Sequence, residues 1–261
     1  MDKEAVVKHI VNWIKNYVHT SKVQGLVVGV SGGVDSALTS KLCALTGLPV
    51  LCLEMPIYQS KDQVNRALKH IQNLMELHPN VEMQSVNLTP VFDAFLKAVP
   101  EDKAHRELAL ANTRARIRMT CLYYFAQMRN SIVVGTGNKV EDFGIGFFTK
   151  YGDGGVDISP IADLLKTEVY ELAEYLNIIP EILQAPPTDG LWGDDRTDED
   201  QIGASYPELE WAMQQYEEGK KPEDFKGRER EVMEIYIKLH TANLHKMIPI
   251  PVCKIPESLK N

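Results

Sequence analysis

Residues 25–40 read GLVVGVSGGVDSALTS, and this stretch decides the expected fold. A short apolar run leads through a pair of glycines into an amphipathic segment that begins near Ser36. Strand, glycine turn and helix in this order form a phosphate-binding unit. Glycine lets backbone N–H groups approach an anion, and the start of the helix adds unpaired N–H groups and the positive end of its dipole. The stretch therefore predicts a phosphate site between residues 29 and 36.

This loop carries an acid where the better-known phosphate loop carries a lysine. In the pattern GxxxxGK[ST] the lysine stands beside the terminal phosphates, whereas the same neighbourhood here holds Asp35. A carboxylate beside phosphate requires a metal, and Mg²⁺ is typically held by one or two carboxylates together with substrate phosphates. We therefore expect Asp35 to bind Mg²⁺, while the hydroxyls of Ser31 and Ser36 contact the phosphates. The alternative is a plain glycine turn between a strand and a helix.

Composition and charge narrow the class of protein. The chain has 261 residues, of which 44% are hydrophobic and 25% are charged, and its formal net charge is −8. This composition suits one globular domain spanning residues 1–261, and the acidic balance speaks against a nucleic-acid partner. No apolar run approaches the roughly 20 residues that a membrane span needs. The N-terminus has no signal-peptide core, and the four cysteines form no CxxC pair. We expect a cytoplasmic protein with no membrane partner.

Predicted strands and helices alternate along the chain. Apolar runs predict strands over residues 26–30, 49–55, 81–86 and 131–134. Helical periodicity covers residues 3–19, 36–45, 61–77, 90–97, 112–128, 166–176, 208–216 and 230–245. This alternation predicts an α/β fold, a doubly wound, Rossmann-like and mostly parallel sheet flanked by helices. We expect the helix over residues 112–128 to be largely buried, an acidic loop to extend to about Gln201, and the helices from about residue 205 to pack on the domain.

A second informative block follows the fourth predicted strand. Residues 133–157 read VVGTGNKVEDFGIGFFTKYGDGGVD. Glu141 offers a second carboxylate for metal, because loops after neighbouring parallel strands open onto one crevice. Lys150 offers a cation for an anionic substrate, and the acids Asp153 and Asp157 lie among glycines. We interpret the block as an active-site loop with glycine hinges, and the alternative is a disordered surface loop.

Two motifs resemble known families. The hexapeptide SGGVDS resembles the signature of the ATP pyrophosphatases of the adenine nucleotide α-hydrolase-like group, which cleave ATP between the α and β phosphates. The run GTGNK…E…GFFTKYGDGGVD is more specific and resembles the NAD synthetase family. That resemblance extends over nearly the whole chain, with further matching residues at positions 112–116, 166, 185–188 and 245–246.

The resemblance implies ATP-dependent amidation of nicotinate adenine dinucleotide to NAD, the last step of NAD biosynthesis. It implies an acyl-adenylate intermediate, release of pyrophosphate and AMP, and no covalent nucleophile on the enzyme. The ATP contacts that it implies are Gly29, Val30, Ser31, Gly32, Gly33, Val34, Asp35, Ser36, Thr136, Lys166 and Thr188. Mg²⁺ would bind to Asp35 and Glu141. The dinucleotide would bind to Arg116, Lys150, Asp157, His245 and Lys246.

The same resemblance carries expectations about the nitrogen source and assembly. Ammonia is the expected nitrogen donor, because glutamine-dependent relatives carry an extra amidase domain and the first helix here begins near Lys3. A homodimer with a shared substrate site is also implied. Three alternatives remain. They are another amidating ATP pyrophosphatase such as a GMP-synthetase-like subunit, a tRNA-modifying enzyme, and a nucleotide-binding regulatory module that does not turn over ATP.

Overall fold

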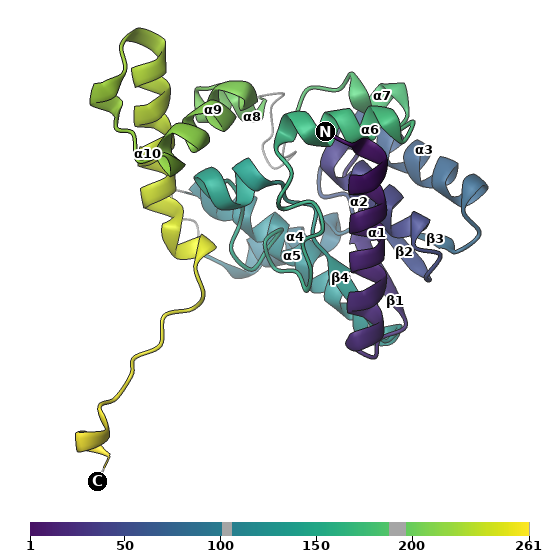
Figure 1. The fold of residues 1–261 in the computed structure, drawn as a ribbon. Helices are drawn as coiled ribbons and strands as arrows, with labels where there is room; N and C mark the ends of the chain where they lie inside the picture. The colour runs from purple at the N-terminus through teal and green to yellow at the C-terminus, as the bar shows by residue number, and fades with distance from the viewer. Residues whose placement is uncertain (101–105, 188–196, 261) are drawn as a thin grey trace.

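A computed structural model describes residues 1–100, 106–187 and 197–260 of the chain. Its centre is a parallel sheet in the order β3–β2–β1–β4, as Figure 1 shows. The strands are β1 (Gly25–Gly29), β2 (Val50–Glu54), β3 (Val81–Ser85) and β4 (Ser131–Val134). All pairs in this sheet are parallel, so the predicted α/β class is confirmed.

The strand order reverses at β1, which places two loops side by side. β1 pairs with β2 on one edge and with β4 on the other, and Val28 lies opposite Val134 in the register with β4. β2 and β3 lie on one side of β1, and β4 lies on the other. This reversal of the strand order is a topological switch point, where ligands bind in doubly wound sheets. The loops that follow Gly29 and Val134 therefore open onto the same crevice.

Helices cover both faces of the sheet. One face carries α1 (Lys3–Thr20), α2 (Val34–Leu45), α3 (Lys61–Leu77), α6 (Lys166–Tyr175) and α7 (Pro180–Leu183). The other carries α4 (Thr89–Ala98) and α5 (Arg106–Met128). Along β1, Leu26 and Val28 belong to the first core and Val27 to the second. Because side chains alternate across a strand, an unbroken apolar run can fill both cores.

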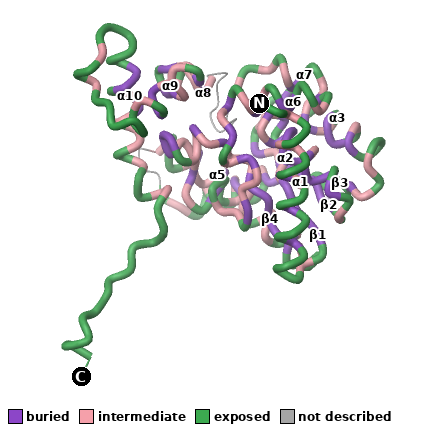
Figure 2. Tube along the Cα trace, viewed as in Figure 1, coloured by how far each residue is buried: buried purple, intermediate pink, exposed green. Residues whose placement is uncertain are grey.

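A third apolar cluster lies beside the sheet. It joins a π-helix, η1 (Val140–Ile145), to α8 (Asp198–Ile202), α9 (Tyr206–Glu217) and α10 (Gly227–Met247). α9 also contacts α6, which links this cluster to the sheet layer. Short 3₁₀ turns occur at η2 (Pro222–Asp224) and η3 (Glu257–Leu259), and residues 248–260 are exposed throughout (Figure 2). None of the described helices has the length and apolar character required to cross a bilayer.

Two local expectations were wrong, namely the start and burial of the helix over residues 112–128 and the end of the acidic loop. α5 begins at Arg106, and its fully buried residues are three alanines, while Tyr124 and Met128 are 60% and 70% exposed. Small alanine side chains let the helix approach the sheet closely. Its larger apolar residues divide between two sides, because Ile117, Leu122 and Phe125 are partly buried against the second core, whereas Tyr124 and Met128 lie on the outer surface. The expected acidic loop ends earlier than predicted, because Thr197 caps α8 through a hydrogen bond to the Asp200 N–H group.

Gly32 has a conformation that only glycine adopts easily. Its φ is +86°, and a Cβ atom there would lie 2.7 Å from the Gln63 carbonyl oxygen. We expect Gly32→Ala to lower the free energy of unfolding by about 2 kcal/mol, because the loop must either strain or move away from α3. Gly33→Ala is the matched control, since its φ is −94° and a Cβ would meet only Ser31 Oγ at 3.4 Å. Urea denaturation compares the two variants, and equal losses would contradict the prediction.

The contact between α2 and α3 contains a buried histidine that should make stability depend on pH. Ser40 Oγ donates to the Ala37 carbonyl and lies 2.9 Å from His70 Nε2, so Nε2 carries the proton and donates to Ser40. Within the described residues the buried Nδ1 has no hydrogen-bond partner. Burial, with the nearby Lys41 charge, lowers the pKa of His70 from 6.5 to about 4.

The unfolded chain therefore takes up a proton below pH 6.5, while the folded chain resists protonation until about pH 4. Stability should be fully present above pH 6.5 and should fall as the pH drops, by about 2 kcal/mol between pH 8 and pH 5. Denaturant titrations across this range measure the fall. His70→Gln, which keeps a donor for Ser40, should flatten the profile by that amount, whereas the exposed His9→Gln should leave it unchanged. A His70→Gln profile as steep as that of the wild type would contradict the assignment.

Candidate functional site

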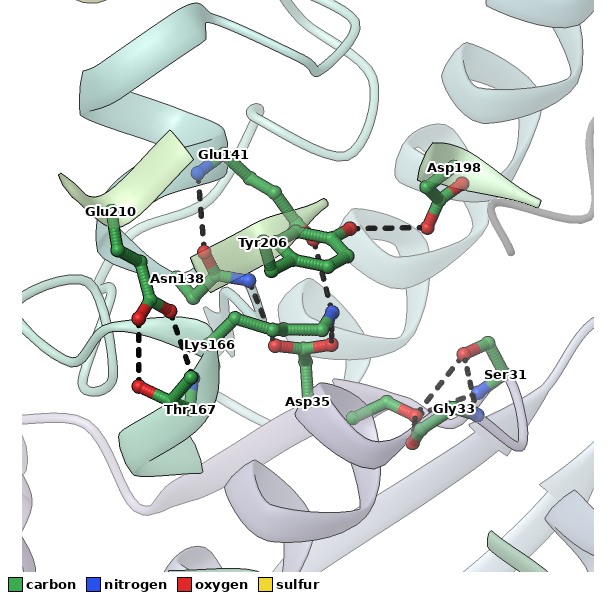
Figure 3. Close-up of polar contacts among 11 residues, drawn as sticks. Ser31, Gly33, Asp35, Asn138, Glu141, Lys166, Thr167, Asp198, Tyr206 and Glu210 are labelled. Carbon is green, nitrogen blue, oxygen red and sulfur yellow. Dashed lines mark hydrogen bonds and ion pairs between the residues drawn. The ribbon is translucent and has the colours of Figure 1, made fainter. Parts of the chain in front are cut away.

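The loop between β1 and α2 is held in shape by its two serines. The Ser31 N–H group donates to Ser36 Oγ at 3.1 Å, and that hydroxyl donates to the Gly33 carbonyl at 3.0 Å (Figure 3). Ser31 Oγ accepts from the Gly33 N–H group at 3.3 Å. Gly33 occupies the N-cap of α2, where a glycine supplies no capping side chain. The N–H groups at the start of α2 therefore have no capping side chain, and we expect them to bind an anion.

Lys166 is the central charge of the site. This first residue of α6 is 4% exposed, and its Nζ atom donates to Asp35 Oδ2 at 2.6 Å and to Glu141 Oε1 at 3.0 Å (Figure 3). The first turn of α6 is anchored to α9, because the N–H and hydroxyl groups of Thr167 donate to the Glu210 carboxylate. The three predicted site residues Asp35, Glu141 and Lys166 are therefore in direct contact.

Two further side chains orient the carboxylates. Asn138, which is fully buried, donates from Nδ2 to Asp35 Oδ1 and accepts at Oδ1 from the Glu141 N–H group. The Tyr206 hydroxyl donates to Glu141 Oε1 at 2.5 Å and lies 3.3 Å from Asp198 Oδ2. Sequence reasoning missed both residues. The motif Ser205-x-x-Glu208 marks the start of α9, but no local pattern places the Tyr206 ring beside Lys166.

Neighbouring groups determine the protonation states of Lys166 and Tyr206 in this hydrogen-bonded network. Burial alone disfavours the ammonium form of Lys166, but Asp35 and Glu141 outweigh burial and raise its pKa above the usual value. Burial and the nearby Glu141 and Asp198 carboxylates raise the pKa of the Tyr206 phenol far above its usual value. At neutral pH, Lys166 is therefore a cation and Tyr206 a hydrogen-bond donor.

A cavity of about 260 Å³ lies in front of this network. Its lining includes every residue from Gly29 to Ser36 together with Thr136, Glu141 and Lys166. The loop after β1 and the loop after β4 therefore do share one crevice. Thr188, the remaining predicted ATP contact, lies outside the described residues.

The donor set fits Mg²⁺. In the described part of the chain, no group of three or more His, Cys, Asp or Glu side chains forms a ready-made metal cage. Two carboxylates, those of Asp35 and Glu141, do converge on one cation, the Lys166 ammonium. Mg²⁺ takes one or two carboxylates and fills its remaining positions with water and substrate phosphate. A pair of acids beside the loop that we expect to bind phosphate is a suitable set for that ion.

The residues expected to bind the dinucleotide form a second cluster, with one exception. The Arg116 guanidinium donates to the Lys150 carbonyl, and Lys150 Nζ donates to the His245 carbonyl at 2.5 Å. Lys246 Nζ donates to the carbonyls of Gly146 and Phe148. These contacts bring the middle of α5, the loop after η1 and the end of α10 together.

Asp157 is the exception, because its hydrogen bonds go to other residues than those of the basic cluster. Its carboxylate accepts from the Val133 N–H group at 2.8 Å and from the Tyr123 hydroxyl at 3.1 Å. Burial and this neighbouring acid raise the pKa of Tyr123 to about 12. In this arrangement Asp157 fastens the segment after the glycine-rich loop to β4 and α5.

The fold and the site define an α/β nucleotide-binding protein in which an acidic phosphate loop and a buried lysine meet at the switch point of a parallel sheet. The model of the NAD synthase family matches residues 6–249. The chain belongs to the NAD synthase family.

Individual relatives agree over most of the chain. The NH(3)-dependent NAD(+) synthetase of Pyrobaculum aerophilum is 39% identical over 253 residues, which are 95% of this chain and 92% of that protein. The NH(3)-dependent NAD(+) synthetase of Archaeoglobus fulgidus is 36% identical over 99% of this chain and 100% of its own.

Solved structures are similar over nearly the full length. NMN synthetase from Francisella tularensis has a TM-score of 0.84 at 32% identity, covering 98% of this chain and 100% of its own. The NH3-dependent NAD synthetase from Campylobacter jejuni, in complex with nitrate, has a TM-score of 0.78 at 28% identity, covering 97% and 100%.

Removing the Lys166 charge should destabilise the protein strongly. Lys166→Met would leave Asp35 and Glu141 facing each other without their cation, and breaking such a buried pair costs about 3 kcal/mol or more. Urea denaturation at neutral pH measures the loss. Millimolar Mg²⁺ should recover part of it in the variant, because the metal can stand in for the ammonium group.

Lys69→Met is the control for this variant. Lys69 also pairs with an acid, Glu181, but its side chain is 61% exposed, so the change should have little effect on stability. Equal losses in the two variants, or no response of Lys166→Met to Mg²⁺, would contradict the assignment of this charge network.

Proposed function

We propose that this chain catalyses the ATP-dependent amidation of nicotinate adenine dinucleotide by ammonia, giving NAD, pyrophosphate and AMP. The observation that carries the proposal is the contact of Lys166 with both Asp35 of the phosphate loop and Glu141 of the loop after β4. Membership of the NAD synthase family and the similarity to NH(3)-dependent NAD(+) synthetases support the substrates and the nitrogen source.

In this proposal the triphosphate of ATP occupies the cavity in front of the network. Backbone N–H groups of residues 32–34 and the hydroxyls of Ser31 and Ser36 bind its oxygens, and Thr136, Lys166 and Thr188 complete the contacts. Lys166 neutralises charge that builds up as the bond between the α and β phosphates breaks. Mg²⁺, bound by Asp35 and Glu141, would supply further positive charge to the leaving pyrophosphate.

The dinucleotide would lie against Arg116, Lys150, His245 and Lys246, with Asp157 at the far end of the same loop. Cations are needed there, because a carboxylate must approach a second anion, the triphosphate. An oxygen of the nicotinate carboxylate forms a bond to the α-phosphorus as pyrophosphate leaves, which gives an acyl adenylate. Ammonia then attacks the acyl carbon, a proton is released, and AMP departs. This sequence requires positioning and charge and uses no covalent nucleophile of the enzyme.

We further propose that the protein acts as a cytoplasmic homodimer whose subunits share the substrate site. The exposed apolar residues Tyr124 and Met128 on α5 support a subunit contact on that helix. All four cysteines are free thiols, and burial raises the pKa of Cys52 to about 12, which fits an inert thiol in a reducing compartment.

A second acceptor is worth testing. The Francisella tularensis protein of similar structure is an NMN synthetase, so nicotinate mononucleotide is the alternative substrate. It carries the same carboxylate and lacks the adenylate half. The two acceptors would react by the same chemistry. They differ in how much of the proposed dinucleotide site they would fill.

The decisive experiment follows NAD and pyrophosphate from ATP, Mg²⁺, ammonium and nicotinate adenine dinucleotide. We expect both products in equal amounts, loss of activity with EDTA, and a much lower rate when glutamine replaces ammonium. Asp35→Asn should reduce turnover by about 100-fold or more, while Asp163→Asn, at an exposed acid paired with Lys139, should remain active. No NAD from the folded protein would refute the proposal, and faster turnover of nicotinate mononucleotide would favour the alternative acceptor.

A further inference from the structure

Arg66 lies beside the phosphate loop, although no motif points to it. Helix α3 packs closely against Gly32, where an added Cβ would lie 2.7 Å from the Gln63 carbonyl, 3.2 Å from the Ala67 nitrogen and 3.4 Å from Arg66 Cβ. The Arg66 side chain therefore starts next to the backbone that is prepared for an anion. It lines both the main cavity and a neighbouring one of about 480 Å³ between α3 and α7.

The hydrogen-bonding groups of Arg66 are incompletely used. Its Nε atom is buried and has no hydrogen-bond partner among the described residues. Leaving a buried donor unpaired is unfavourable, and more so for a charged group. An acceptor that enters the cavity with the ligand would satisfy this donor.

The other cations of the cavity are already engaged. In the described lining they are Lys166, which binds Asp35 and Glu141, and Arg118, which donates to the Met55 carbonyl and to Gln59 Oε1. ATP brings a triphosphate whose outer oxygens carry most of its charge. Of the described cavity cations, Arg66 is the one with a buried donor that is unpaired, and that donor is available for those oxygens.

We propose that Arg66 binds the terminal phosphates of ATP and retains the pyrophosphate after the bond between the α and β phosphates has broken. The inference rests on the proposed function, in which ATP phosphates occupy residues 29–36. Arginine suits this role because its planar N–H groups pair with phosphate oxygens in a fixed geometry. Its place at the border of the second cavity puts it at the outer end of the triphosphate, away from the dinucleotide cluster on α5 and α10.

Calorimetric titration of the full-length protein with α,β-methylene ATP, pyrophosphate and AMP tests the proposal. Arg66→Ala should weaken binding of the ATP analogue and of pyrophosphate by about tenfold and leave AMP binding unchanged, because AMP lacks the terminal phosphates. In steady state the KM for ATP should rise more than kcat falls, and pyrophosphate should inhibit less strongly. Arg66→Lys, which keeps the charge but loses the Nε donor, should lie between wild type and alanine.

Lys61→Ala removes the same charge from the exposed start of α3, outside the cavity lining, and should change none of these affinities. Equal weakening of AMP and the ATP analogue by Arg66→Ala, or unchanged binding of both, would overturn the proposal. If Arg66→Ala does not fold, the Arg66→Lys titrations decide in the same way. These outcomes can be distinguished from failure of the proposed function. In that case the wild-type protein would bind the nucleotides but make no NAD.

Discussion

The site depends on one buried ammonium group held between two carboxylates. Moving a lysine charge out of water is expensive, and good geometry with opposite charges must repay it. Lys166 meets that condition with Asp35 from the start of α2 and Glu141 from η1. Each of these residues comes from a different element, so the network forms only when the elements are correctly placed. The same three charges then face the cavity where phosphates are expected to bind.

The strand order explains why those elements meet. β1 is central, and the loops after β1 and β4 leave the sheet at adjacent carboxyl ends. The first loop supplies Asp35 and the second supplies Asn138 and Glu141. Asn138 connects them directly, since its amide touches both the Asp35 carboxylate and the Glu141 backbone. The sheet thus fixes the distance between the carboxylates more firmly than either loop could alone.

Structure that depends on neighbouring residues could be predicted from the sequence. Contacts between segments that are far apart in the chain could be predicted less well. Apolar periodicity locates α3 over its full range, and the glycine loop with Asp35 is readable because strand, turn and helix are contiguous. The burial of α5 was misjudged, because its buried residues are alanines, while its larger apolar residues are partly buried or exposed. Tyr206 and Arg66 belong to ordinary helical patterns. Their importance arises from tertiary contacts with Glu141 and Gly32, which no local rule contains.

The Tyr206–Glu141 hydrogen bond also has a consequence for how the protein is made. The phosphate loop is synthesised early and could form with the first βαβ unit, yet Tyr206 and the basic end of α10 follow long afterwards. Closing contacts of such long sequence separation is slow and depends on the whole chain. A nascent or C-terminally degraded chain would thus possess the nucleotide loop and Asn138 without the Tyr206 hydroxyl that orients Glu141. Completion of the active site is in this way coupled to completion of the polypeptide.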